Sequence, residues 1–170
     1  MENNINTPTN ITADTVNNIY NDAINDPQLL STIDVDELLD SLETTNNDYL
    51  ENKTLDSITK EVYDSVSEAI IDKKTQEDIC MKLVGYRLVD ELQDLHKGKH
   101  IRWIRRANSK LTNGGVVVDI KFLDNGTHIL CMNSGRRFIQ YKYDECVTFQ
   151  KLSQTESLIL MIYEHAETMT

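Results

Sequence analysis

The residues best suited to chemistry are cations and aromatic side chains gathered in the second half of the chain. Residues 96–151 carry 11 Lys and Arg against 4 Asp and Glu, whereas residues 1–95 carry 21 Asp and Glu against 6 Lys and Arg. Cations neutralise phosphates and flat side chains stack on bases, so this composition favours nucleic-acid binding. The candidate nucleic-acid-binding residues are Arg102, Arg105, Arg106, Lys110, Lys121, Arg136, Arg137, Tyr141 and Lys142, with Trp103 and Phe138 beside them.

Strand alternation predicts where some of these cations point. Arg102 lies between Ile101 and Trp103, and Lys121 lies between Ile120 and Phe122. Because successive strand residues face opposite sides of a sheet, both cations are predicted on an outer face. The competing interpretation is an ordinary solvated face, with Trp103 and Phe138 in the core.

An aromatic cage for a methylated Lys or Arg is a second kind of site. It would use the rings of Trp103, Tyr141 and Tyr143, with Asp119 or Asp144 as the acid. A cage needs its rings to converge at one rim, and only Tyr143 stands at a predicted strand end. Core packing is therefore the favoured interpretation of these rings.

Metal binding and catalysis have weaker signals. His96 and His100 are four residues apart, but Gly98 breaks the helix that would place both on one face. Cys131 and Cys146 form no CxxC pair, which favours buried free thiols. The chain contains no Ser-His-Asp pattern, no phosphate-binding glycine loop and no HExxH motif. We therefore expect no enzyme, no metal and no cofactor.

The acidic half contains a separate candidate interface. Thr54 can cap a helix that has one apolar stripe. The helix-interface candidates are Leu55, Ile58, Val62, Val66 and Ile70. This stripe could bind a protein partner or a second copy of the chain, or it could cover a sheet in the same chain, and both alternatives stay open here.

The elements around these residues follow from hydrophobic periodicity. Residues 1–32 have too few apolar residues for a core and are expected to be disordered or loosely ordered. Residues 33–96 have the spacing of amphipathic helices: one within 33–50, one after Thr54, and one from Thr75 to about Lys97. From Ser153, an S-x-x-E capping box predicts a C-terminal helix.

Between these helices the period changes from 3.6 to 2, which predicts five short strands joined by tight turns. Asp124-Asn125-Gly126 predicts a type I′ hairpin turn. The expected fold is α+β: an acidic helical N-terminal half, a small five-stranded antiparallel SH3-like or Tudor-like barrel, and a C-terminal helix. Residues 97–170 would form the barrel with its closing helix. A flat five-stranded sheet covered by helices is the alternative.

Residues 97–160 resemble a family on three pieces of sequence. These are K-x-I-R-W-I, then L-T-x-G-G followed by V-x-D-I-K, and F-Q-K-L-S-x-x-E at the start of the last helix. The segment is similar to an uncharacterised C-terminal domain of nucleocytoplasmic large DNA viruses, mimivirus-like ones in particular. The resemblance implies a viral protein of cytoplasmic replication or of the particle. It supplies no catalytic residues.

The location and function follow as expectations. No apolar run is long enough to span a bilayer, and the N-terminus lacks the pattern of a signal peptide. We expect no membrane and no secretion, but the host cytoplasm or the virion, in a reducing environment. The expected function is a non-enzymatic binding or structural protein whose basic barrel contacts nucleic acid. The alternative is a protein–protein adaptor or virion structural component that uses the acidic helices.

Overall fold

The computed structural model describes residues 45–168, and these form two compact units. One unit, residues 58–152, contains most of α4 (Leu55–Ala69), α5 (Lys73–Lys82) and the whole sheet. The other unit, residues 45–57 and 153–168, contains η1 (Thr45–Leu50) and α6 (Gln154–Thr168). The segment 1–32 and most of the helix predicted within 33–50 lie outside the described residues.

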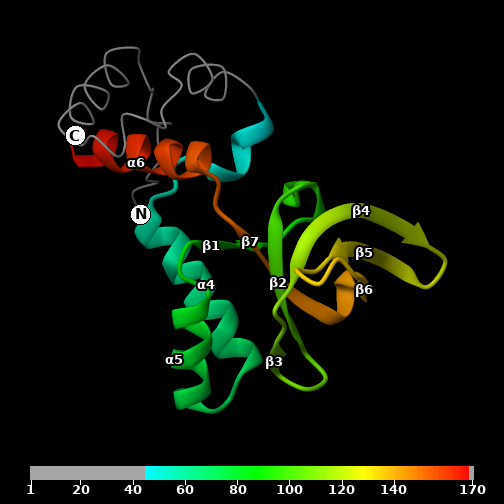
Figure 1. The fold of residues 1–170 in the computed structure, drawn as a ribbon. Coiled ribbons are helices and arrows are strands. Elements are labelled where there is room, and N and C mark those ends of the chain that lie inside the picture. The colour runs from blue at the N-terminus through cyan, green and yellow to red at the C-terminus, as the bar shows by residue number, and fades with distance from the viewer. Residues whose placement is uncertain (1–44, 169–170) are drawn as a thin grey trace, which may run out of the picture. The chain divides into compact units, whose positions relative to one another are not determined.

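The sheet is antiparallel and has seven strands within the described residues, in the order β1-β7-β2-β4-β5-β6, with β3 paired to β2 (Figure 1). Short 3-10 turns, η2 (Leu92–Asp94) and η3 (Tyr143–Glu145), precede β2 and β7. The strands are β1 (Tyr86–Val89), β2 (His100–Arg105), β3 (Lys110–Leu111), β4 (Gly115–Leu123), β5 (Gly126–Met132), β6 (Phe138–Lys142) and β7 (Cys146–Lys151).

The predicted closed barrel of five strands is wrong. The described sheet is open, with β1 at one edge and β6 at the other. The extra edge strand β1 lies inside the helix predicted from Thr75 to about Lys97. That prediction fails because α5 begins at Lys73, ends at Lys82 and is followed by Gly85, after which the chain pairs with β7. The apolar residues of this segment fit both helical and strand spacing, and strand pairing with β7 decides between the two.

The turn between β4 and β5 also differs from its prediction. Leu123 pairs with Gly126, so the hairpin loop consists of Asp124 and Asn125. A type I′ turn requires positive φ at both loop residues, but here only Gly126 has positive φ, at 123°. The hairpin is confirmed, whereas its predicted turn type is wrong.

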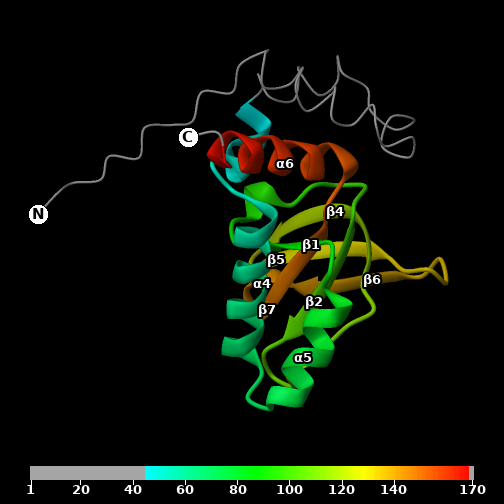
Figure 2. The ribbon, with the colours of Figure 1, turned by 90° about the vertical axis from the view of Figure 1, so that its left-hand side faces the viewer.

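Hydrophobic clusters lie on both faces of the central strands β2 and β7. α4 and α5 lie together on one side of the sheet, while the β4–β5 hairpin extends away from them (Figures 1 and 2). The inner cluster consists of Val89, Leu95, Ile101, Trp103, Val117, Ile129, Cys131, Tyr141 and Cys146. The helix-side cluster consists of Val62, Val66, Ile70, Ile79, Leu83, Ile104 and Phe149.

Side chains connect the edge strand β6 to the central strands. The rings of Trp103 in β2 and Tyr141 in β6 stack with their centroids 4.0 Å apart and their planes 12° apart. The hydroxyls of Tyr141 and Thr148 in β7 are hydrogen-bonded at 2.8 Å. The sheet therefore curls over the inner cluster through ring packing, without a backbone ladder between β6 and β7.

The capping box predicted for the C-terminal helix is confirmed. The Ser153 amide donates to Glu156 Oε1 (3.0 Å), and the Glu156 amide donates to Ser153 Oγ (3.1 Å). The hydroxyl of Tyr49, in η1 of the same unit, donates to Glu156 Oε2 (2.7 Å). Glu156 is only 4% exposed, so these bonds satisfy a buried carboxylate.

His100 is expected to make the fold less stable in mildly acidic solution. Its Nδ1 lies 3.0 Å from the Tyr86 hydroxyl, and burial, followed by Arg102 and Lys151, lowers the pKa of its imidazole. An unfolded chain, in which the pKa of His is about 6.5, takes up a proton that the folded imidazole resists. The free energy of unfolding should therefore fall as the pH decreases through that value.

Denaturation curves for the wild type and for His100→Asn, at about pH 7.5 and about pH 5.5, check this expectation. The variant should lose the part of the pH dependence that His100 causes. An identical pH dependence in both proteins would contradict the assignment.

Candidate nucleic-acid interface

The turn between β2 and β3 presents three of the predicted cations. We call Arg105, Arg106 and Lys110 the basic turn; every residue from 105 to 110 is exposed. The Ser109 amide donates to the Arg105 carbonyl (2.8 Å), and the Ser109 hydroxyl donates to the Ala69 carbonyl of α4 (3.2 Å). The turn therefore has a defined shape before any ligand binds.

Two cations of the basic turn face each other across a strand pair. Arg105 and Lys110 are register partners in the β2–β3 ladder. Like charges directly opposite each other in a ladder repel and destabilise the pair. Within the described part of the chain, no carboxylate lies within ion-pair distance of Arg105, Arg106 or Lys110. An anion bound between Arg105 and Lys110 would remove this repulsion.

The turn between β5 and β6 presents two more cations. We call Arg136 and Arg137 the arginine turn; both side chains are exposed. The Arg136 amide donates to the Asn133 carbonyl (3.0 Å), and the Arg137 amide donates to Asn133 Oδ1 (2.9 Å). Arg136 has φ 57°, which is the left-handed region that favours glycine.

Lys121 and Lys142 come together on the outer face of the sheet, the face of β4–β6 opposite the inner cluster. Each is a register partner of His128, which lies between them on β5. Lys142 is paired with Glu145 (3.2 Å), so its charge is partly compensated. Lys121 has no carboxylate within ion-pair distance among the described residues.

Arg102 and Tyr141 are placed where they support the fold. Arg102 Nε donates to the Thr112 carbonyl (2.9 Å) and Nη1 to the Lys82 carbonyl (3.4 Å). Tyr141 is only 5% exposed and stacks on Trp103, so its ring has no open face for a base. The sequence contains no signal for this difference, because the packing partners come from distant segments.

The apolar stripe of α4 packs within the chain. Val62, Val66 and Ile70 belong to the helix-side cluster, and Ile58 is also buried. Leu55 is half-buried. Of the two uses left open by the sequence, covering the chain's own sheet is the arrangement observed for Val62, Val66 and Ile70.

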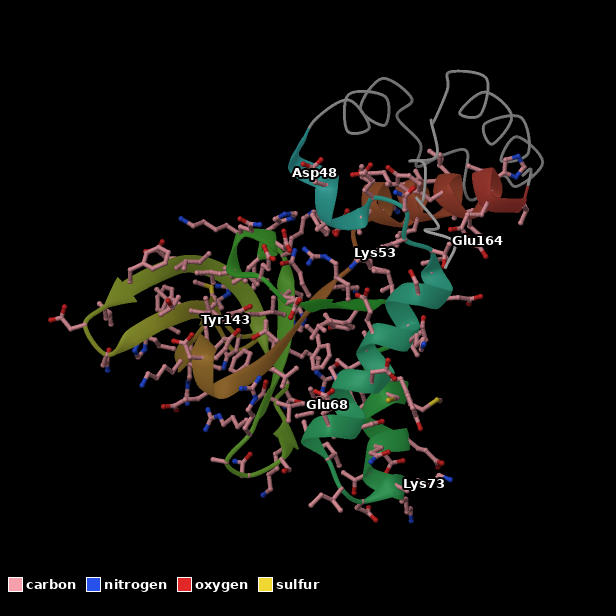
Figure 3. The ribbon with its side chains drawn as sticks, turned by 180° about the vertical axis from the view of Figure 1, so that it is seen from behind. Asp48, Lys53, Glu68, Lys73, Tyr143 and Glu164 are labelled. Atoms are coloured by element: carbon pink, nitrogen blue, oxygen red, sulfur yellow. The ribbon has the colours of Figure 1, made fainter. Side chains whose placement is uncertain are left out.

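Tyr143 lines a pocket of about 480 Å³ in the unit of residues 58–152. Figure 3 labels Tyr143 on η3 and Glu68 on α4, which both line it. The Tyr143 hydroxyl donates to the Val89 carbonyl (3.1 Å), and its pKa is raised by burial and then by nearby acidic residues, Asp90 foremost. Trp103 is buried in the inner cluster, so the three rings do not form a cage.

Residues 45–168 contain neither a metal-holding cluster nor a disulfide. No group of three or more His, Cys, Asp or Glu is arranged there to hold a metal ion. All three cysteines are free thiols, and burial raises the pKa of the Cys131 thiol to about 12. In the same part of the chain, no helix is both long and apolar enough to cross a bilayer.

The exposed cations on the two turns can therefore bind phosphate groups. The sequence predicts each of these cations as a binding residue, together with Arg102 and Tyr141, which the fold uses elsewhere. No protein family, curated protein or solved structure matches this chain.

Proposed function

We propose that this chain is a non-enzymatic protein that binds nucleic acid through the basic turn and the arginine turn. One observation carries the proposal: five exposed cations lie on two turns held in shape by hydrogen bonds, with no described carboxylate within ion-pair distance. Binding phosphates at such turns costs little ordering of the backbone. Release of counterions from the nucleic acid then supplies the free energy.

The net charge of the chain sets the conditions for this binding. The whole chain carries a formal charge of −11, which repels a polyanion at long range. Local attraction at the two turns must exceed this repulsion, so we propose a contact that is weak at high salt and strong at low salt. The proposal thus predicts steep salt dependence rather than high affinity under all conditions.

The resemblance of residues 97–160 supports a viral setting for this function. We propose an accessory or particle protein of a large DNA virus, which acts in the reducing environment of the host cytoplasm or in the virion. The alternative is a protein–protein adaptor or virion structural component that uses the α4 stripe. It has less support, because Val62, Val66 and Ile70 are already buried within the chain.

Combined charge reversal of Arg105, Arg106, Arg136 and Arg137 to Glu is expected to reduce nucleic-acid binding by the full-length protein by at least about 100-fold. The measurement is fluorescence anisotropy with labelled DNA and RNA over a salt series. In the wild type, the logarithm of the affinity should fall linearly with the logarithm of the salt concentration. The variant should have a smaller slope, because fewer phosphates are neutralised.

A charge-matched control separates a local contact from the effect of net charge. In this control, four exposed lysines on α4 and α5 are replaced by Glu: Lys60, Lys73, Lys74 and Lys82. This control should retain most of the binding. Equal losses in the two variants, or no binding by the wild type at about 50 mM salt, would contradict the proposed function.

A further inference from the structure

We propose that the bound nucleic acid is single-stranded, and that the arginine turn holds its phosphates while Phe138 stacks on one of its bases. This inference rests on the proposed function, since it names the class of nucleic acid that the protein binds. The geometry combines an exposed ring, two cations next to it in the chain, and backbone strain in the same turn.

Phe138 is an exposed ring at the edge of the sheet. It begins the edge strand β6 directly after Arg137 and is 62% exposed. Its register partner is Met132, which in turn pairs with Val116, itself 40% exposed. Because cross-strand partners share a face, the three side chains form an apolar row beside the arginine turn, exposed at Phe138 and Val116 and half-buried at Met132. A ring in this position can stack on a base while the neighbouring cations contact phosphates.

Arg136 occupies a backbone position that glycine would occupy at lower cost. The Asn133 amide donates to the Arg137 carbonyl (2.9 Å), which leaves a three-residue loop from residue 134 to 136. The last residue of such a loop adopts the left-handed conformation, which glycine tolerates best. Arg136 adopts it at φ 57°, and its side chain forms no ion pair with a described residue. Strain of this kind at a non-glycine residue is typical of functional positions.

Asp119, an acidic residue on this face, is expected to repel a bound phosphate only weakly. Asp119 lies on β4 and pairs with Lys97 at 3.1 Å. Lys97 therefore compensates the carboxylate before any ligand arrives. The outer face thus keeps Lys121 and the apolar row, and the arginine turn connects β5 to β6 at the end of that row, next to Met132 and Phe138.

Stacking on Phe138 requires a base that has one uncovered face. In a duplex both faces of each base are covered by the neighbouring bases, so a ring such as Phe138 has no surface on which to stack. In a single strand each base can turn one face outward. Because every base has such a face, we expect binding with little dependence on base sequence.

The test compares labelled oligothymidine of about 12 nucleotides with a duplex of the same length, both bound to the full-length protein. We expect the single strand to bind about tenfold more tightly, and Phe138→Ala to reduce its affinity about tenfold while duplex binding is unchanged. Phe122→Ala is the matched control: this ring is 76% exposed near the tip of the β4–β5 hairpin, and its removal should change neither affinity.

A second variant separates function from structure at the turn. Arg136→Gly should raise the thermal unfolding midpoint and also weaken single-strand binding several-fold. A stability gain without any loss of affinity would overturn the role of Arg136 in binding. Equal affinities for duplex and single strand, both insensitive to Phe138→Ala, would overturn the inference but leave the proposed function intact if charge reversal still abolished binding. Absence of wild-type binding would contradict the proposed function itself.

Discussion

Trp103→Ala is expected to lower the free energy of unfolding by about 3–5 kcal/mol, as large aromatic truncations in a core do. Trp103 is 1% exposed, and its ring stacks on Tyr141. This contact joins β6 to β2 where no backbone ladder connects them. Removing the indole leaves a cavity in the inner cluster and removes the packing of β6 against β2, while the β5–β6 ladder remains. Urea denaturation followed by circular dichroism measures the loss.

Trp103→Phe is the matched control for this prediction. It keeps a ring against Tyr141 and removes the indole Nε1, a buried group without a hydrogen-bond partner in the described structure. The loss should therefore be below about 1.5 kcal/mol, as for other conservative core changes. If the Ala and Phe variants were equally stable, ring stacking between Trp103 and Tyr141 would not contribute to the stability of the fold.

Gly114→Ala is expected to destabilise the fold by about 2–5 kcal/mol, because a left-handed backbone and a steric clash add up at this position. Gly114 has φ 75°, and a Cβ atom there would lie 1.8 Å from the Ile101 carbonyl oxygen of β2. A methyl group would have to push β2 away from the start of β4. Denaturation curves measure the loss directly.

Substitutions at two other glycines separate the cost of the left-handed backbone from the cost of the steric clash. Gly98 has φ 80°, but a Cβ atom added there would have no neighbour within 4 Å, so Gly98→Ala should cost only about 1–2 kcal/mol from the backbone conformation. Gly135 lacks positive φ, and its nearest neighbour would be Asn133 Oδ1 at 3.4 Å, so Gly135→Ala should change stability by less than about 0.5 kcal/mol. A loss at Gly114 no larger than that at Gly98 would contradict the clash with Ile101.

Local sequence signals predicted the parts of the fold that depend on neighbouring residues. The Ser153–Glu156 capping box forms, and the Ser57 amide donates to Thr54 Oγ1 at the start of α4 as a capping threonine requires. These interactions span three residues, so the side-chain types in a short window determine them. The hairpin between β4 and β5 was predictable for the same reason.

Signals that depend on distant residues were ambiguous. The stretch around β1 has apolar residues that suit a helix, and only the pairing of Tyr86–Val89 with β7, some 60 residues further along the chain, makes it a strand. The helix-side cluster likewise depends on α4 and α5 meeting the sheet. Arg102 was grouped with the binding cations because nothing nearby in the sequence shows that Thr112 and Lys82 occupy its guanidinium.

The amino-acid sequence by itself determined the helix caps at Thr54 and Ser153, the position of the β4–β5 hairpin, and the cation-rich composition of the basic turn and the arginine turn. Each of these depends on residues within a few positions of one another. The tertiary structure decided that the sheet is open rather than closed, that Tyr141 is buried, and that the cations of the two turns stay exposed. Those outcomes follow from which segments pair and which faces become covered, and such contacts form between residues that are far apart in the chain.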